Sequence, residues 1–303
     1  MNKEETKISS CDLFFEIIDK VYNSKNDILF FSYSIFSGID NSFYKNNKNR
    51  IKFEQDIWED YSILKKNYEY IYKQYEFLLE QFSNELNKIH NKNYSKRYWR
   101  ILIGPWIFLF ISIIFERWFS IRGIFKNNKI EKIFIRQETK NYVTTDIDEF
   151  RNIYILNDWN HNLYNKILKY FKNDNYVINY YKSNNDTQNY LTRSLNLSFK
   201  QKIAKTLLRT SFTSFFKNKD YLFFSSGFDR KRKKIINKNL EKSVFLPPIP
   251  KFLRENFQVD KNLRDRLAIK EYDNTNFSKF LVEQIKENIP LVYLELVDER
   301  LNL

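Results

Sequence analysis

The sequence predicts an α/β protein that carries a long helical hairpin. Short apolar runs of strand-forming residues alternate with amphipathic helical segments, which is the pattern of an α/β fold. Between about residues 54 and 122 this pattern gives way to one amphipathic and one strongly apolar helical segment. At 303 residues, the chain is long enough for one large domain or two ordinary ones. We therefore expect an α/β domain over residues 1–245 with a helical insertion at about 54–122.

The first expected element is a buried strand. Asp27–Phe36 is apolar and aromatic, is rich in strand formers, and ends at Ser37-Gly38, which is a turn signal. Residues 41–50 consist mostly of Asn and Lys, a composition typical of an exposed loop.

A long amphipathic helix is predicted next, from Ile57 to Ile89. Apolar residues recur there at alternating steps of three and four, with charged residues between them. Such a stripe suits packing against the apolar helix that follows; a partner helix or a coiled coil is the alternative. His90 falls near the end of this helix, where a polar side chain suits the exposed carbonyl groups.

The apolar segment Ile101–Phe115 poses the question of a membrane span. As a helix rising about 1.5 Å per residue it would reach only ~22 Å, which is short of the roughly 30 Å of a bilayer's hydrocarbon core. Gly104-Pro105 also interrupts the backbone hydrogen bonding, because proline has no N–H to donate, and Glu116-Arg117 prevents an extension. We expect a buried helix and no transmembrane segment, with peripheral contact at a membrane face left open.

The remaining elements are read from the same patterns. Strands are predicted at Lys132–Arg136, Phe150–Leu156 and Asp220–Ser225, and helices at Trp159–Tyr170, Phe199–Leu208 and Phe277–Ile285. Pro290–Val297 is expected to be a final strand or a segment that leads toward further sequence. Leu246–Pro250 contains three prolines, which fix an extended backbone. Residues 246–303 are therefore expected to form a Pro-rich connector followed by a C-terminal helix and strand.

Composition limits the cellular compartment and the partners. The single cysteine, Cys11, permits neither an intramolecular disulfide nor a thiolate zinc site, and no secretory signal is visible, so a cytoplasmic location is expected. A net charge of +14 and the basic cluster Arg230–Lys234 invite a nucleic-acid interpretation. The whole composition is skewed toward Asn, Lys, Ile, Tyr and Phe, as AT-rich codons would give. We therefore favour a solvated helix start for this cluster over a phosphate, nucleic-acid or anionic-lipid contact.

Several standard chemistries are absent from the sequence. The four glycines are scattered, so there is no phosphate-binding loop, and there is no Gly-x-Ser-x-Gly elbow. The only two histidines are His90 and His161, which excludes a multi-histidine metal centre, and no acidic cluster argues for Mg²⁺. We therefore predict no metal site.

Three arginines are candidates for substrate binding. Arg97, Arg100 and Arg117 flank the apolar segment, where a guanidinium can form paired hydrogen bonds with a carboxylate or a phosphate. The alternative is an internal ion pair, for example between Arg117 and Asp60 or Glu59.

His161 and Asp158 are the catalytic candidates. His161 lies just beyond a predicted strand, where its imidazole could take a proton from an acceptor hydroxyl while Asp158 sets its tautomer or pKa. A packing or capping role for the histidine is the alternative. Trp99 and Trp159 are candidates for stacking on a sugar ring or a base, against the alternative that they are core residues.

A set of motifs also supports a family resemblance. The block Tyr98–Trp106 is followed by the acidic-Arg-aromatic step Glu116–Trp118. Further blocks at compatible spacing are Ile57–Asp60, Leu86–His90, Asp158–Tyr164, Asp220–Phe223 and Ile289–Glu295. From about Glu54 onward, the chain thus resembles a family of transferases encoded with bacterial O-antigen and surface-carbohydrate biosynthesis genes.

The resemblance implies a Rossmann-like N-terminal, acceptor-side half of a two-domain glycosyltransferase-like fold, with the helical hairpin as an insertion. It implies an activated, nucleotide-linked sugar donor, a carbohydrate substrate and a cytoplasmic location, at the inner face of the membrane. It also implies that residues 246–303 lead toward a second, glycine-rich half that this chain lacks, so that the chain alone would be an incomplete transferase. The alternatives are a non-catalytic binding or assembly protein and a basic nucleic-acid-binding module.

Overall fold

The computed structural model describes residues 10–32, 39–54, 57–58, 61–139, 142–171, 176–182, 221–224, 229–240, 243–246 and 259–295. The chain forms two compact units, one made of residues 1–187 with 258–303 and the other of residues 188–257. This division differs from the expected boundary after residue 245, because the helices that follow residue 258 pack with the first unit.

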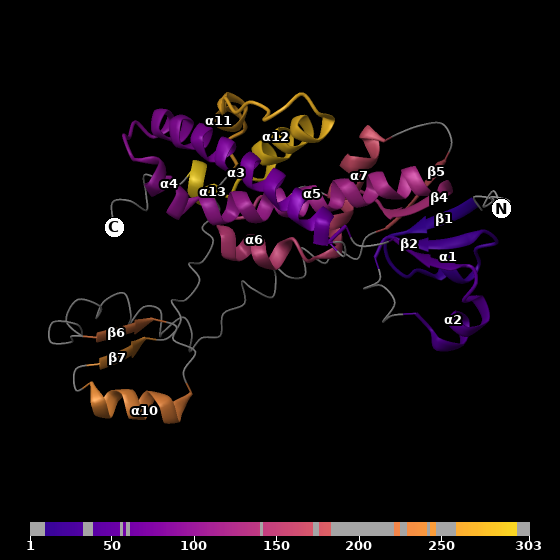
Figure 1. Cartoon of the computed structure of the whole chain (residues 1–303), viewed down its shortest axis with the longest axis horizontal. Helices are drawn as coiled ribbons and strands as arrows, with labels where there is room; N and C mark the ends of the chain where they lie inside the picture. The colour runs from indigo at the N-terminus through magenta and orange to yellow at the C-terminus, as the bar shows by residue number, and fades with distance from the viewer. Residues whose placement is uncertain are drawn as a thin grey trace. The chain divides into compact units, whose positions relative to one another are not determined.

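The first unit contains a five-stranded parallel sheet. Its strands are β1 (Ser10–Phe14), β2 (Asp27–Phe30), β3 (Ile51–Phe53), β4 (Lys129–Arg136) and β5 (Val177–Tyr181), in the order β3-β2-β1-β4-β5 (Figure 1). The direction of progression along the sheet therefore reverses between β1 and β4. This strand order is that of the Rossmann fold, and it confirms the predicted Rossmann-like α/β class.

Both faces of the sheet are covered, as parallel sheets require. On one face, Phe14, Phe30 and Phe134 stand side by side in register and pack with Val21 of α1 (Asp19–Tyr22). Phe43 and Tyr44 of α2 (Asn41–Asn47) join this cluster from its edge. On the other face, the alternate residues Leu13, Leu29 and Ile133 are buried, and α7 (Asn157–Tyr170) packs on β4.

The helical insertion is an antiparallel hairpin. Helix α3 (Tyr61–Ile89) packs along α5 (Gly104–Asn127), and the short α4 (Lys96–Leu102) joins them (Figure 1). The chain bends by 63° between α4 and α5, at the predicted Gly-Pro break, where Pro105 occupies the first turn of α5. A Cβ on Gly104 would lie 2.8 Å from the Tyr75 hydroxyl oxygen, so a larger residue at this bend would have to displace the end of the Tyr75 side chain.

No single helix in the described residues is long and apolar enough to cross a bilayer. Helices α4 and α5 together do reach that length and apolarity, as a pair broken by the 63° bend.

The C-terminal segment closes the helical layer. Helices α11 (Lys261–Arg266), α12 (Asn276–Asn288) and α13 (Leu291–Leu294) follow one another there, with α12 against α5. Arg264 of α11 forms a buried ion pair with Glu295, its Nε donating to Oε1 at 2.8 Å, and its Nη2 also donates to the Ile289 carbonyl at 2.8 Å. One buried guanidinium thus holds the three C-terminal helices together.

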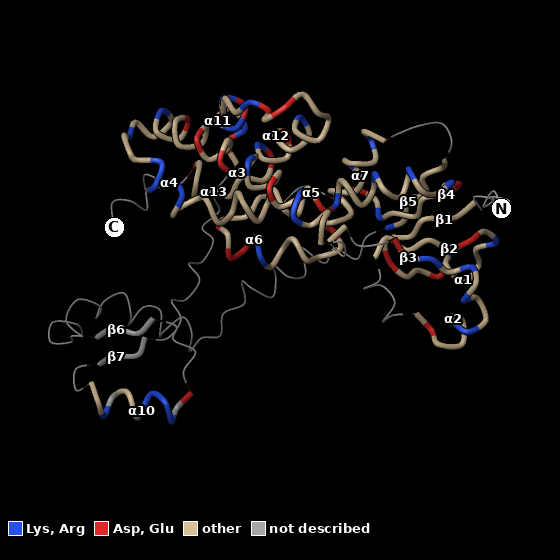
Figure 2. The backbone as a smooth tube through the Cα atoms, viewed as in Figure 1, with Lys and Arg blue, Asp and Glu red and all other residues tan. Residues whose placement is uncertain are grey.

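The second unit contains a small βαβ motif. Strands β6 (Tyr221–Phe224) and β7 (Ser243–Leu246) pair in parallel, and α10 (Arg230–Asn239) connects them. The basic cluster Arg230–Lys234 forms the first turns of α10, as predicted (Figure 2). Asp229 caps this helix by accepting a hydrogen bond from the Arg232 backbone N–H.

Three predicted elements are wrong. Phe150–Leu156 is not a strand, because α6 (Ile147–Ile153) occupies most of it, capped by Asp146. Pro290–Val297 is not a strand at its described positions, which include α13. Residues 41–50 are not simply a loop but contain α2, capped by Asp40.

Other predicted elements agree with the structure or cannot be compared with it. The long helix, the strands at 132–136 and 220–225 and the helices at 159–170 and 277–285 correspond to α3, β4, β6, α7 and α12. The strand predicted at 27–36 corresponds to β2, which ends at Phe30. The predicted helix at 199–208 and residues 247–250 of the connector lie outside the described residues.

We predict that Arg264→Met destabilises the first unit by about 3–5 kcal/mol, because it leaves the Glu295 carboxylate buried without its partner. Urea unfolding at pH 7 measures the change. The control is Arg151→Met, which removes an exposed ion pair with Asp148 and should change the free energy of unfolding by less than about 1 kcal/mol. Equal losses in the two variants would contradict this account of the C-terminal segment.

Candidate functional site

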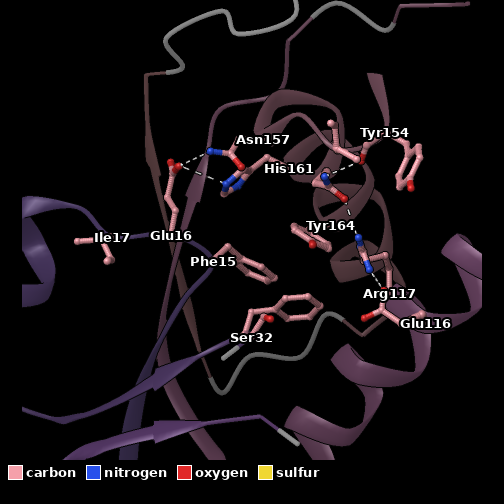
Figure 3. Close-up of a pocket in the computed structure, with 13 residues that line it drawn as sticks. Phe15, Glu16, Ile17, Ser32, Glu116, Arg117, Tyr154, Asn157, His161 and Tyr164 are labelled. Carbon is pink, nitrogen blue, oxygen red and sulfur yellow. Dashed lines mark hydrogen bonds and ion pairs between the residues drawn. The ribbon is translucent and has the colours of Figure 1, made fainter. Parts of the chain in front are cut away.

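A pocket of about 520 Å³ lies at the carboxyl ends of β1 and β2 (Figure 3). Its walls come from the segments that follow these two strands, from the middle of α5 and from the start of α7. The lining residues are Phe15, Glu16, Ile17, Phe31, Ser32, Glu116, Arg117, Tyr154, Ile155, Asn157, Asn160, His161 and Tyr164. In open parallel sheets, ligands bind outside the carboxyl ends of the strands where the strand order reverses, and this pocket borders that place beside β1.

The buried guanidinium of Arg136, at the end of β4, organises one wall of the pocket. Its Nε and Nη2 atoms each donate to a Glu16 carboxylate oxygen at 2.6 Å, and its Nη1 donates to Asp158 Oδ1 at 2.9 Å. Glu16 follows β1 and Asp158 lies in the first turn of α7. Arg136 therefore joins the ends of two neighbouring strands to the start of a helix by bidentate, charge-assisted hydrogen bonds.

Glu16 is saturated with hydrogen-bond donors. Besides the two bonds from Arg136, its oxygens accept from the Tyr181 hydroxyl at 2.6 Å and from the Asn157 side-chain amide at 3.1 Å. Burial would raise the pKa of Glu16, but the hydrogen bonds from Arg136 and Tyr181 outweigh burial and lower it. Glu16 is therefore a carboxylate at neutral pH, and its oxygens are already occupied.

His161 is buried beside this wall and is neutral at pH 7. Burial lowers the pKa of its imidazole to about 4. Its Nδ1 faces the Arg136 backbone N–H at 3.3 Å and accepts from it, so the proton of the neutral ring is on Nε2, which lies 3.8 Å from Glu16 Oε1. In this arrangement the imidazole offers an N–H donor rather than a free lone pair.

Arg117 and Glu116 form the opposite side of the pocket. They are adjacent on α5, their side chains form an ion pair, and both are mostly but not fully buried, at 22% and 18% exposure (Figure 3). Arg117 Nε also donates to Asn160 Oδ1 at 3.2 Å. The Asn160 amide donates in turn to the carbonyls of Tyr154 and Leu156, which fixes its orientation. A guanidinium and a carboxylate are thus held at the same cavity.

Aromatic rings form the floor between these two polar sides. Phe15 stacks on Tyr164 with ring centroids 4.5 Å apart, and Phe31 meets the same ring at 4.8 Å. The edge of His161 meets Tyr164 at 5.9 Å. The pocket therefore combines flat apolar surfaces with hydrogen-bonding groups at its rim, the usual composition of a small-molecule site.

Of the predicted site residues, the structure brings His161, Asp158 and Arg117 to this region. His161 and Arg117 line the pocket, while Asp158 lies behind the wall, bonded to Arg136. The imidazole's tautomer is therefore set by the Arg136 backbone, while burial chiefly lowers the pKa of His161 and the Asp158 carboxylate acts to raise it. The expected partners of Arg117, residues 59 and 60, lie outside the described residues, and its recorded ion pair is with Glu116.

The other predicted substrate-binding residues do not line the pocket. Trp99 is fully buried and donates its indole N–H to Asn87 at 3.0 Å, which corrects the expectation that it stacks on a ligand. Arg100 forms a bidentate ion pair with Glu76 on α3. Arg97 is exposed on α4. Trp159 is 6% exposed and packs edge-on against Phe150, so it is a core residue of α7.

Glu16, Glu116 and Arg136 are not among the residues predicted from the sequence for this site. Arg136 is the last residue of a predicted strand. An arginine at the carboxyl end of a strand in a parallel sheet is a signal for a ligand site. Glu116 belongs to the acidic-Arg-aromatic step, but only its arginine was considered. Glu16 follows β1, which was not predicted and therefore gave no signal.

No group of three or more His, Cys, Asp or Glu side chains suited to a metal ion occurs among the residues that the structure describes. The titratable groups around the pocket are instead engaged with arginines and amides.

The sequence model of the LIC12162 family of transferases matches residues 12–300. The chain belongs to this LIC12162 transferase family. The match begins in β1, so it also includes the opening strands, which the motif resemblance did not reach. A comparison with curated proteins and one with solved structures gave no match. Family membership agrees with the predicted transferase, and in this LIC12162 family transferase both the Glu116-Arg117 step and His161 lie at the pocket.

The low pKa of His161 predicts a loss of stability in mild acid. The unfolded chain takes up a proton as the pH falls below 6.5, whereas folded His161 resists protonation until about pH 4. This group alone should therefore make the protein about 2 kcal/mol less stable at pH 5 than at pH 7.

His161→Asn tests this prediction, because the Asn amide oxygen can still accept from the Arg136 N–H while it cannot titrate. Urea unfolding at pH 7 and at pH 5 gives the free energy of unfolding at each pH. The decrease from pH 7 to pH 5 should be about 2 kcal/mol smaller in the variant than in the unmodified protein. The same drop in the variant and in the unmodified protein would show that folded His161 titrates normally.

Proposed function

We propose that this LIC12162 family transferase is a glycosyl-type group transferase that serves surface-polysaccharide biosynthesis and acts at the inner face of the cytoplasmic membrane. The observation that carries the proposal is the pocket, which places a guanidinium, a carboxylate and an imidazole N–H around an aromatic floor at the carboxyl ends of the sheet. Sugars present both hydroxyl groups and apolar ring faces, so hydrogen-bonding groups beside stacked aromatic rings fit them.

Transfer to a sugar hydroxyl requires a group that receives its proton, and Glu116 is the best-placed candidate. The oxygens of Glu16 already accept four hydrogen bonds, and His161 Nδ1 is occupied by a backbone N–H. Glu116 borders the cavity, and Arg117 is its ion-pair partner. A positioned carboxylate of this kind can act as a general base.

Arg117 and His161 suit the other requirements of the reaction. A nucleotide-linked sugar leaves behind a phosphate on which negative charge increases, and a guanidinium is well suited to such a group. The Nε2–H of His161 would donate to an oxygen of the bound sugar and orient it. In this proposal Arg136, Glu16 and Asp158 position these groups without contacting the substrate.

We predict that Glu116→Gln and Arg117→Gln each lower the rate of transfer about 100-fold or more, because each removes a charged group from the pocket without changing its volume greatly. The measurement is the release of nucleoside diphosphate from a panel of nucleotide-linked sugars in the presence of surface-glycan extract. Arg100→Gln is the matched control, since it also breaks an Arg–Glu pair in the hairpin but away from the pocket.

The control should retain transfer within about threefold, and thermal unfolding should show that all three variants fold. Unmodified rates in both pocket variants would overturn the assignment of the pocket. Absence of transfer in the unmodified protein with every sugar donor of the panel would overturn the glycosyl proposal.

A further inference from the structure

An exposed row of tyrosines runs along the first half of α3. Tyr61, Tyr68 and Tyr72 are 79%, 54% and 44% exposed. Their spacing of seven and four residues places them on one side of the helix, and the exposed Lys65 lies on the same side. Large aromatic side chains gathered on one exposed face mark an interaction surface.

This row continues onto α4 and α5. Tyr68 stacks on Tyr72 and also meets Phe108 of α5, with ring centroids 6.2 Å apart in both pairs. Phe108 in turn contacts Tyr75, and the Arg100 guanidinium lies 5.8 Å from the centre of the Tyr75 ring. The row of tyrosines on α3 is therefore linked to Arg100 of α4 through Phe108 and Tyr75.

Helix α4 adds an apolar and a cationic side chain. Ile101 is 71% exposed, and the exposed Arg97 lies four residues before it, on the same side of α4 and away from the buried Trp99. We call the surface formed by Tyr61, Lys65, Tyr68, Tyr72, Arg97 and Ile101 the α3–α4 face.

The α3–α4 face is cationic. The nearby acids Glu76 and Glu80 are already paired, Glu76 with Arg100 and Glu80 with Lys96 at 2.9 Å. Lys65 and Arg97 form no ion pair within the described part of the chain. Figure 2 shows basic residues at α4 and residues of both charges along α3. Glu69 is a further exposed acid on this half of α3, but the exposed cations Lys65, Lys66, Lys73 and Arg97 outnumber it, so the exposed aromatic groups are accompanied by net positive charge.

We infer that the α3–α4 face docks on the surface of an anionic lipid bilayer. Tyrosine side chains suit the membrane–water interface, because the ring enters the apolar region while the hydroxyl stays hydrated. Lysine and arginine beside them are attracted by anionic headgroups. This face would make the membrane contact named in the proposed function. The biological purpose of docking rests on that proposed function, but docking itself requires no transfer reaction.

A second copy of the chain fits this face less well. A two-fold symmetric contact sets the same patch against itself, so its net positive charge, to which Lys65 and Arg97 contribute, would face a second positive patch. An anionic surface instead neutralises both.

Co-sedimentation with vesicles, in the absence of any sugar donor, tests the inference. The protein should bind vesicles of phosphatidylcholine mixed with phosphatidylglycerol, and bind vesicles of phosphatidylcholine alone much more weakly. Lys65→Gln with Arg97→Gln should weaken binding to the anionic vesicles about 25-fold, or about fivefold per charge. Tyr68→Ser with Tyr72→Ser should weaken binding to the same vesicles several-fold.

Matched controls come from the sheet, α1 and α11. Lys129→Gln with Lys261→Gln removes the same net charge from exposed positions elsewhere, and Tyr22→Ser with Tyr180→Ser removes two tyrosines that are 40% and 53% exposed. Both controls should bind like the unmodified protein, and thermal unfolding should show that all variants fold.

Three results would overturn the inference: no binding of the unmodified protein to anionic vesicles, equal losses in the face variants and the controls, or a dimer in solution that the tyrosine variant abolishes without any vesicle binding. Vesicle binding without transfer would count against the proposed function alone. Transfer without vesicle binding would count against the α3–α4 face alone.

Discussion

The buried guanidinium of Arg136 is the interaction on which the candidate site depends. It ties Glu16 after β1 and Asp158 in α7 to the end of β4, and its backbone N–H fixes the His161 ring. An unpaired cation in this position would be costly to bury, so the two carboxylates and the arginine require one another. The result is a wall whose side chains hold their orientations before any ligand enters, which is the preorganisation that catalysis uses.

The motifs on which the resemblance rests separate into two groups once the structure is known. One group builds the helical layer: Asn87 accepts from the indole of Trp99, His90 approaches the Tyr293 carbonyl at 3.4 Å, and Glu295 pairs with Arg264. The other group lies at the pocket or directly behind it, and its members are Glu116, Arg117, Asp158, Asn160 and His161. A place in one of these motifs is therefore not by itself a sign of contact with substrate.

Two of the errors in the predicted elements have a common cause. Phe150–Leu156 and Pro290–Val297 are short apolar segments, and such segments do not show whether their period is that of a strand or of a helix. The side chains of Asp146 and Asp40 cap the helices α6 and α2, which occupy two of the wrongly predicted segments. Both capping residues are visible in the sequence. Longer segments such as α3 were predictable, since several helical turns repeat the same pattern.

The sequence by itself determined the α/β class, the helical hairpin with its Gly-Pro break, and the motifs that indicate a transferase family, because these depend on local periodicity and on residue identity. Tertiary structure decided which charged residues meet. Arg100 and Arg117 stand in similar sequence contexts, yet one pairs with α3 and the other lines the cavity. Glu16 and Arg136 are 120 residues apart and become neighbours only because β1 and β4 pair. Long-range strand pairing places them together, and no local pattern encodes it.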